Sequence, residues 1–138
     1  MQGSPADDTP APLRGGQLLA AISNRVVGML REHYGRGPIN AKTYALHDMI
    51  VVVLRGSGFT ALEQTMIDSG EPEQVIAMRE EFQRVMADRF TEMIEELTGH
   101  NVLAFMRRVH LEPDITIETF FIDEPLLGSD TPETTEPQ

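Results

Sequence analysis

Apolar side chains recur at the spacing of a single helix face in two segments of the chain, residues 17–34 and 73–98. The stripe of the first segment consists of Leu18, Ile22, Val26, Met29 and Leu30. Gly35 and Pro38 follow this segment and predict its end. The stripe of the second segment has a near-heptad spacing and consists of Val75, Met78, Phe82, Val85, Met86, Arg89, Phe90, Met93 and Leu97. A helix of this length spans about 39 Å, so we expect one end to project beyond a small domain and to need a partner.

Four further segments have the character of β-strands. They are residues 39–45, 49–55, 101–109 and 115–122. The run from Met49 to Leu54 is apolar without alternation, which is typical of a central strand covered on both faces. A short helix is expected from Ala61 to Asp68, because Thr60 and Glu63 match a capping box.

The elements follow the order α-β-β-α-α-β-β, which predicts an α+β domain of two layers. We expect a four-stranded, mostly antiparallel sheet with the helices on one face. Residues 15–123 form the predicted domain. Residues 1–14 and 124–138 are rich in proline and acidic side chains and poor in large apolar ones, so both are expected to be disordered.

The last predicted strand carries large apolar side chains on both faces. One face has Ile115, Ile117, Thr119 and Phe121, and the other has Thr116, Glu118, Phe120 and Ile122. A two-layer domain buries only one of these faces, so the other predicts an interface. We expect a symmetric homodimer, with Phe120 and Ile122 as the candidate dimer face. The alternative is that residues 126–127 of the C-terminal segment cover the exposed side chains.

The net charge of −11 changes the range of plausible partners. An acidic chain repels phosphate backbones and anionic lipid, so neither nucleic-acid binding nor membrane docking is expected. The longest apolar run, residues 49–54, is far too short to cross a bilayer, and we expect no direct membrane insertion. The chain has no cysteine, which excludes disulfides, thiolate catalysis and cysteine-bound metals. No signal peptide is recognised, and a cytoplasmic location is expected.

The basic and histidine side chains are the main candidates for binding. On a strand Arg107 and Arg108 point to opposite faces, and either one enters the helix layer only with a buried carboxylate partner. The candidate contacts for a small anion or for a carboxylate of a partner are Arg36, Lys42, Arg107, Arg108 and His110. Salt-bridged surface side chains are the alternative interpretation of these residues.

Two weaker patterns also need an interpretation. Gly35 to Pro38 resembles part of a phosphate loop, but it follows a helix and opens a strand, so a helix stop and a tight turn explain it better. His47 and His110 lie in predicted turns near Asp48 and Asp114, and would form a His/carboxylate cluster if the two turns lay side by side. No cofactor motif and no metal-ligand spacing are recognised.

Seven short motifs together resemble a known bacterial family. They are Gly15-Gly16-Gln17-Leu18, Tyr34-Gly35-Arg36-Gly37-Pro38, Ala41-Lys42-Thr43-Tyr44, Met49-Ile50-Val51-Val52-Val53-Leu54, Leu62-Glu63-Gln64-Thr65, Leu97-Thr98-Gly99 and Pro113-Asp114-Ile115-Thr116. In order and spacing these motifs are similar to those of the MpsC-like family over about residues 15–123. The family is associated with a sodium-translocating, membrane-potential-generating system, and related membrane partners are linked to inorganic carbon uptake. The resemblance implies a soluble accessory or regulatory component whose membrane partner subunits carry out transport, and it implies no reaction.

Three functions remain open at this point. The first is an interaction module that serves a membrane ion or inorganic-carbon system. The second is a stand-alone sensor that binds a small anion through the basic residues named above. The third is an unrecognised enzyme that uses His47 or His110.

Overall fold

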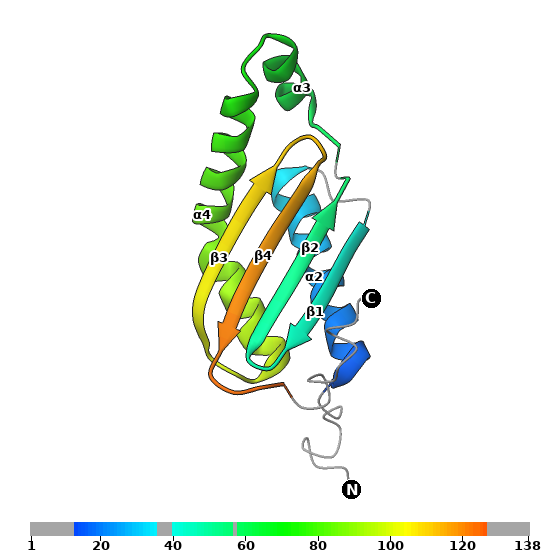
Figure 1. Ribbon diagram of the computed structural model, residues 1–138, viewed down its shortest axis with the longest axis vertical. Helices are drawn as coiled ribbons and strands as arrows, with labels where there is room; N and C mark the ends of the chain where they lie inside the picture. Colours follow the sequence, from blue (N-terminus) through cyan, green and yellow to red (C-terminus); the bar gives the residue numbers. More distant parts are fainter. Residues whose placement is uncertain (1–12, 36–39, 57, 127–138) are drawn as a thin grey trace, which may run out of the picture.

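The computed structural model describes residues 13–35, 40–56 and 58–126, and Figure 1 shows how they are arranged. The elements are α2 (Gly15–Tyr34), β1 (Asn40–Leu46), β2 (Met49–Arg55), α3 (Ala61–Asp68), α4 (Pro72–Thr98), β3 (Val102–His110) and β4 (Ile115–Ile122). Their order is the α-β-β-α-α-β-β order that the sequence predicts. Most of the two predicted tails, residues 1–12 and 127–138, lies outside the described residues.

The four strands form one sheet in the order β1-β2-β4-β3, and every neighbouring pair is antiparallel. Both α2 and α4 lie against the same face of this sheet (Figure 1). The predicted two-layer α+β architecture is therefore confirmed. We call the sheet face toward α2 and α4 the inner face and the opposite one the outer face.

Burial alternates along β2, although its sequence does not alternate in polarity. Ile50, Val52 and Leu54 are buried beneath the helices, whereas Met49, Val51 and Val53 are only partly buried on the outer face. The expectation that this strand is covered on both faces is therefore wrong for the described residues, because both covering helices lie on one side.

The core lies between the inner face and the two long helices. Its fully buried large side chains include Ile22 of α2, Phe90 and Ile94 of α4, and Phe120 and Ile122 of β4. Phe105 of β3 stacks on Phe120 with ring centroids 4.6 Å apart, which continues the aromatic packing across the sheet.

The assignment of Phe120 and Ile122 to the dimer face is therefore wrong. Both side chains are 0% exposed and point into the helix layer. The sequence alone did not show which face of β4 is buried, because the face with Phe120 and Ile122 also carries the polar Thr116 and Glu118. The structure buries Glu118 by pairing it with Arg107, and the apolar residues Ile115, Ile117 and Phe121 remain on the outer face.

The buried face of α4 is rotated relative to the predicted stripe. Val85 is 64% exposed and Arg89 is also exposed, whereas Arg79, Gln83 and Ile94 are buried. The first turns of α4 extend beyond the end of the sheet together with α3, as Figure 1 shows. Packing there uses a charged side chain, Arg79, where the sequence pattern predicted apolar contacts.

Candidate functional site

A buried ion pair joins the two helices at the end of the domain that extends beyond the sheet. Glu63 of α3 is 1% exposed, and Arg79 of α4 is 8% exposed. The Nε of Arg79 donates to Oε2 of Glu63 at 2.8 Å, and its Nη2 donates to Oε1 at 2.9 Å. This two-pronged arrangement is the strongest geometry available to an arginine and a carboxylate.

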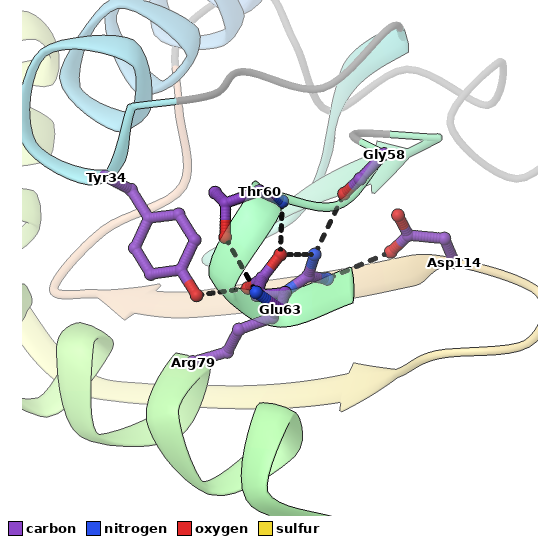
Figure 2. Close-up of polar contacts among 6 residues, drawn as sticks. All are labelled: Tyr34, Gly58, Thr60, Glu63, Arg79 and Asp114. Atoms are coloured by element: carbon purple, nitrogen blue, oxygen red, sulfur yellow. Dashed lines mark hydrogen bonds and ion pairs between the residues drawn. The ribbon is translucent and has the colours of Figure 1, made fainter. Parts of the chain in front are cut away.

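The remaining donors of Arg79 reach two other parts of the chain. Nη1 donates to Oδ1 of Asp114 in the β3–β4 turn at 3.1 Å, and Nη2 donates to the carbonyl oxygen of Gly58 at 3.0 Å (Figure 2). The guanidinium also lies 5.3 Å from the ring centre of Phe59. One side chain thus connects α4 to α3, to the loop before α3 and to the end of the sheet.

Glu63 occupies this position because of the local sequence. Thr60 is the N-cap of α3 and its hydroxyl accepts from the backbone N–H of Glu63, while the Glu63 carboxylate accepts from the backbone N–H of Thr60. This is the predicted capping box. The hydroxyl of Tyr34, at the last turn of α2, donates to Oε2 of Glu63. The cap therefore fixes a carboxylate that two other helices also contact.

These contacts shift the acid–base properties of the cluster. Burial alone raises the pKa of Glu63, but hydrogen bonds from Arg79, Tyr34 and the Thr60 backbone outweigh it and lower that pKa below its ordinary value. Burial, followed by the hydrogen bond to Glu63 and its charge, raises the pKa of Tyr34 to about 12. Near neutral pH Glu63 is a carboxylate and Tyr34 is a phenol, so neither is poised to transfer a proton.

A second buried pair lies further along the inner face. Arg107 and Glu118 are directly opposite each other on β3 and β4, with Nε and Oε2 3.4 Å apart. Burial lowers the pKa of Arg107 to about 10 and raises that of Glu118, and in each case attraction between the pair opposes the shift. Arg107 thus enters the helix layer with a buried carboxylate partner, as the sequence required.

A small cavity of about 40 Å³ lies between the two pairs. Its lining includes Glu63 and Arg79 of the first pair, Arg107 of the second, and Gln83 of α4. Nη1 of Arg107 and Oε1 of Gln83 are buried without a hydrogen-bond partner. The cavity is large enough for water or a very small polar molecule.

The predicted anion contacts do not form one site. Arg36 lies outside the described residues, and Arg107 points into the helix layer. Lys42 and Arg108 both lie on the outer face, in the same row of paired residues across the sheet. They are far apart in that row, because Lys42 is on β1 and Arg108 is on β3, the two edge strands. Arg108 and His110 are neighbours on one face of β3.

The suggested His/carboxylate cluster is not formed. His47 lies in the β1–β2 turn and His110 at the end of β3, and strand pairing places them at opposite ends of the sheet. Asp114 binds Arg79, and Nδ1 of His110 is 2.8 Å from the carbonyl oxygen of Pro113. Within the described ranges no cluster of three or more histidine or acidic side chains is arranged to hold a metal ion.

Sequence reasoning missed the Tyr34–Glu63–Arg79–Asp114 cluster. Arg79 follows Val75 by four residues and so occupies a core position of α4, a signal that a buried partner was needed. The capping box alone accounted for Glu63 in the sequence, so its ion pair with Arg79 was not predicted.

The fold and these contacts define a two-layer α+β domain in which one buried ion pair joins α3 to α4, a second joins β3 to β4, and Arg79 also links α4 to the β3–β4 turn. The model of one family, the Na+-translocating membrane potential-generating system (MpsC), matches residues 14–124. The match covers well over half of the 138 residues, and the chain belongs to this family. Neither a search of the curated proteins nor one of the solved structures finds a match. No helix among the described residues is both long and apolar enough to cross a membrane.

Proposed function

We propose that this chain is a soluble, cytoplasmic accessory or regulatory component of a sodium-translocating, membrane-potential-generating system. It acts by binding partner subunits and does not itself catalyse a reaction. Membership of the MpsC family supports the association with such a system. The cluster at the α3–α4 junction supports a non-catalytic role, because its charged side chains are occupied in holding the helices together.

The observation that carries the proposal is the outer face of the sheet, which no helix among the described residues covers. Tyr44 is 42% exposed, Ile117 41% and Met106 52%, although all three belong to strands. The half of this face toward the β1–β2 turn is apolar apart from one threonine. We call it the apolar half, and it consists of Tyr44, Leu46, Met49, Val51, Ala104, Met106, Thr119 and Phe121. An uncovered apolar patch of this kind marks an interaction surface.

We further propose that the apolar half, extended by the exposed Leu103, is where two copies associate as a symmetric homodimer. Two sheets can pack face to face with their side chains interdigitated. A two-fold axis across the strands brings identical apolar halves together and leaves the other halves at opposite ends. This replaces the face assigned from the sequence.

Sedimentation equilibrium at tens of micromolar tests the dimer. We expect a mass near twice 15.4 kDa for the natural chain and a monomer for Met106→Lys, because the lysine would be buried without a partner. Val85→Lys is the matched control, since Val85 is also exposed, at 64% against 52% for Met106, but lies on α4 and not on the outer face. A natural chain that remains a monomer contradicts the proposal, as does an unchanged dimer for Met106→Lys.

Co-purification from membranes of the native bacterium tests the accessory role. A tagged chain is expected to retain an integral membrane subunit of an ion-transport system after gentle solubilisation. Tagged variants with an altered outer face serve as controls for specificity. Retention of no membrane transport subunit under these conditions contradicts the accessory role.

A stand-alone small-anion sensor is the second candidate, and the cavity beside Arg107 is what favours it. Nη1 of Arg107 lacks a partner there, so a very small anion has a charged donor within reach. Thermal-shift measurements with bicarbonate, phosphate and nucleotides test this alternative. The cavity volume predicts no stabilisation by nucleotides.

A further inference from the structure

The half of the outer face toward the β3–β4 turn differs in chemistry from the apolar half. Strand pairing places Lys42, Val53, Ile117 and Arg108 in one row across the sheet, and Asn40, Arg55, Ile115 and His110 in the next. We call these two rows the basic half. Neither these rows nor the apolar half contains an aspartate or a glutamate, in a chain with 22 acidic residues and 11 lysines and arginines.

The three lysine and arginine side chains of the basic half, Lys42, Arg55 and Arg108, are exposed. Lys42, Arg55 and Arg108 make no ion pair with any residue that the structure describes, whereas Arg25, Arg79, Arg84 and Arg107 each do. The nearest carboxylates in sequence to His110 are Glu112 and Asp114 in the β3–β4 turn, and Asp114 is held by Arg79. No carboxylate in the part of the chain that the structure describes neutralises Lys42, Arg55 or Arg108.

The spacing of the basic side chains indicates the size of a binding partner. Lys42 and Arg108 are separated by three strand-to-strand steps, or about 14 Å. Arg55 lies one row further on, and His110 follows Arg108 at about 7 Å along β3. One small anion cannot reach all of these groups, but a polypeptide segment that crosses the strands can. Val53, Ile115 and Ile117 provide apolar contacts between the cations.

We propose that the basic half binds an acidic segment of a partner polypeptide, with carboxylates on Lys42, Arg55 and Arg108 and apolar side chains over Val53 and Ile117. This rests on the proposed function, in that it names the chemistry of the partner that an accessory component would recognise. Charge-assisted contacts from arginine to carboxylate give such an interface both its register and a fast association rate.

Two other occupants fit the charges less well. A second copy offers an outer face with no carboxylate, so face-to-face pairing of the basic halves brings cations together. An anionic membrane presents its charge over a wide plane and repels the rest of a molecule with net charge −11. A short acidic segment interacts only locally, because salt screens charges beyond about 8–10 Å.

The probe for the test is a short fluorescein-labelled peptide of alternating glutamate and leucine, with a lysine-and-leucine peptide as its counterpart. Fluorescence anisotropy measures binding to the full chain. The double variant Lys42→Gln/Arg108→Gln removes two cations from the basic half. Arg14→Gln/Arg31→Gln removes the same charge from two exposed positions elsewhere, neither of which makes an ion pair with a described residue, and is the matched control.

We expect the acidic peptide to bind and the basic peptide not to bind. The Lys42/Arg108 variant is expected to weaken binding about fivefold to tenfold, because two exposed charge contacts are lost. The control variant is expected to bind within about twofold of the natural chain, since it retains the basic half. Higher salt weakens the interaction, as expected for exposed ion pairs.

Three results overturn the inference. The first is that the acidic peptide does not bind, and the second is that both double variants weaken its binding equally. The third is that the chain does not bind the peptide but sediments with phosphatidylglycerol vesicles, and not with phosphatidylcholine vesicles, in a manner that depends on Lys42 and Arg108. Peptide binding that depends on Lys42 and Arg108 supports it even if no membrane subunit co-purifies. In that case the accessory role fails and the acidic-segment site stands.

Discussion

At the scale of single residues, the two buried arginines of this domain differ in how many hydrogen-bond partners they have. Arg79 distributes its donors over Glu63, Asp114 and the carbonyl oxygen of Gly58. Arg107 has one carboxylate partner, and its Nη1 is left without a hydrogen bond. An arginine with several partners connects the elements that supply them, whereas an arginine with a single partner leaves stability dependent on that one pair.

The chain has two tyrosines, and this makes the acid–base state of Tyr34 measurable. In Tyr44→Phe the remaining tyrosine is expected to ionise with a midpoint of about 12, because burial and the hydrogen bond to Glu63 favour the phenol. Its pKa is raised on folding, so its contribution to stability is complete below about pH 10 and is lost between about 10 and 12. Absorbance at the tyrosinate band, followed against pH in the folded protein, checks the midpoint. Ionisation near pH 10 without unfolding contradicts the contact.

The Arg107–Glu118 pair predicts strong non-additivity. Arg107→Leu leaves Glu118 buried without its partner and is expected to lower the free energy of unfolding by about 3–5 kcal/mol at neutral pH. This loss shrinks at lower pH, because burial raises the pKa of Glu118 and a protonated carboxyl carries no charge. Arg107→Leu/Glu118→Leu is expected to recover most of the stability. Urea unfolding of both single variants and the double variant measures the coupling, and additive losses would contradict it.

At the scale of the elements, the spacing of apolar residues located the helices and strands correctly but placed one helix face imperfectly. The predicted helix over residues 73–98 is α4, Pro72–Thr98, and the capping box at Thr60 opens α3 as expected. The predicted buried stripe was wrong at Val85 and Arg89, which are exposed. The near-heptad pattern of α4 could not show that Arg79 is buried instead, because its partner Glu63 belongs to another helix. A contact between distant parts of the chain has no signature in local periodicity.

The corrected face of α4 gives a graded prediction for core substitutions. Phe90 is fully buried, so Phe90→Ala is expected to lower the free energy of unfolding by about 3–5 kcal/mol. Phe82 is half-buried, with its ring 4.8 Å from that of Tyr34, and Phe82→Ala is expected to be less harmful than Phe90→Ala. Val85→Ala is expected to stay within about 0.5 kcal/mol because Val85 is exposed. Denaturant unfolding measures the series, and a different rank order would show that the assigned face is wrong.

At the scale of the whole molecule, the two-layer fold followed from element order, but the chemistry of its surfaces did not. The sequence indicated that one face of β4 would be exposed, and we assigned that face to Phe120 and Ile122. In the structure this face is buried together with Glu118, so the opposite face of β4 is the outer one. The basic candidates Lys42, Arg108 and His110 do lie on a common face, but only the strand order shows that they span the sheet. Surface sites assembled from several strands depend on that order, which one sequence does not specify.

The C-terminal limit of the folded unit provides the last prediction. The sequence placed the end of the domain at residue 123, yet Leu126 is 3% exposed and belongs to the core with residues of α2 and α4. Removal of residues 127–138, which are proline-rich and acidic, is expected to change the melting temperature by no more than about 2–3 °C. A chain that ends at residue 123 loses Leu126 as well and is expected to melt substantially lower, because Leu→Ala changes in a core already cost about 2–5 kcal/mol. Leu126→Ala in the full chain separates loss of this side chain from loss of the segment. Equal melting temperatures for chains that end at 123 and at 126 would contradict a structural role for Leu126.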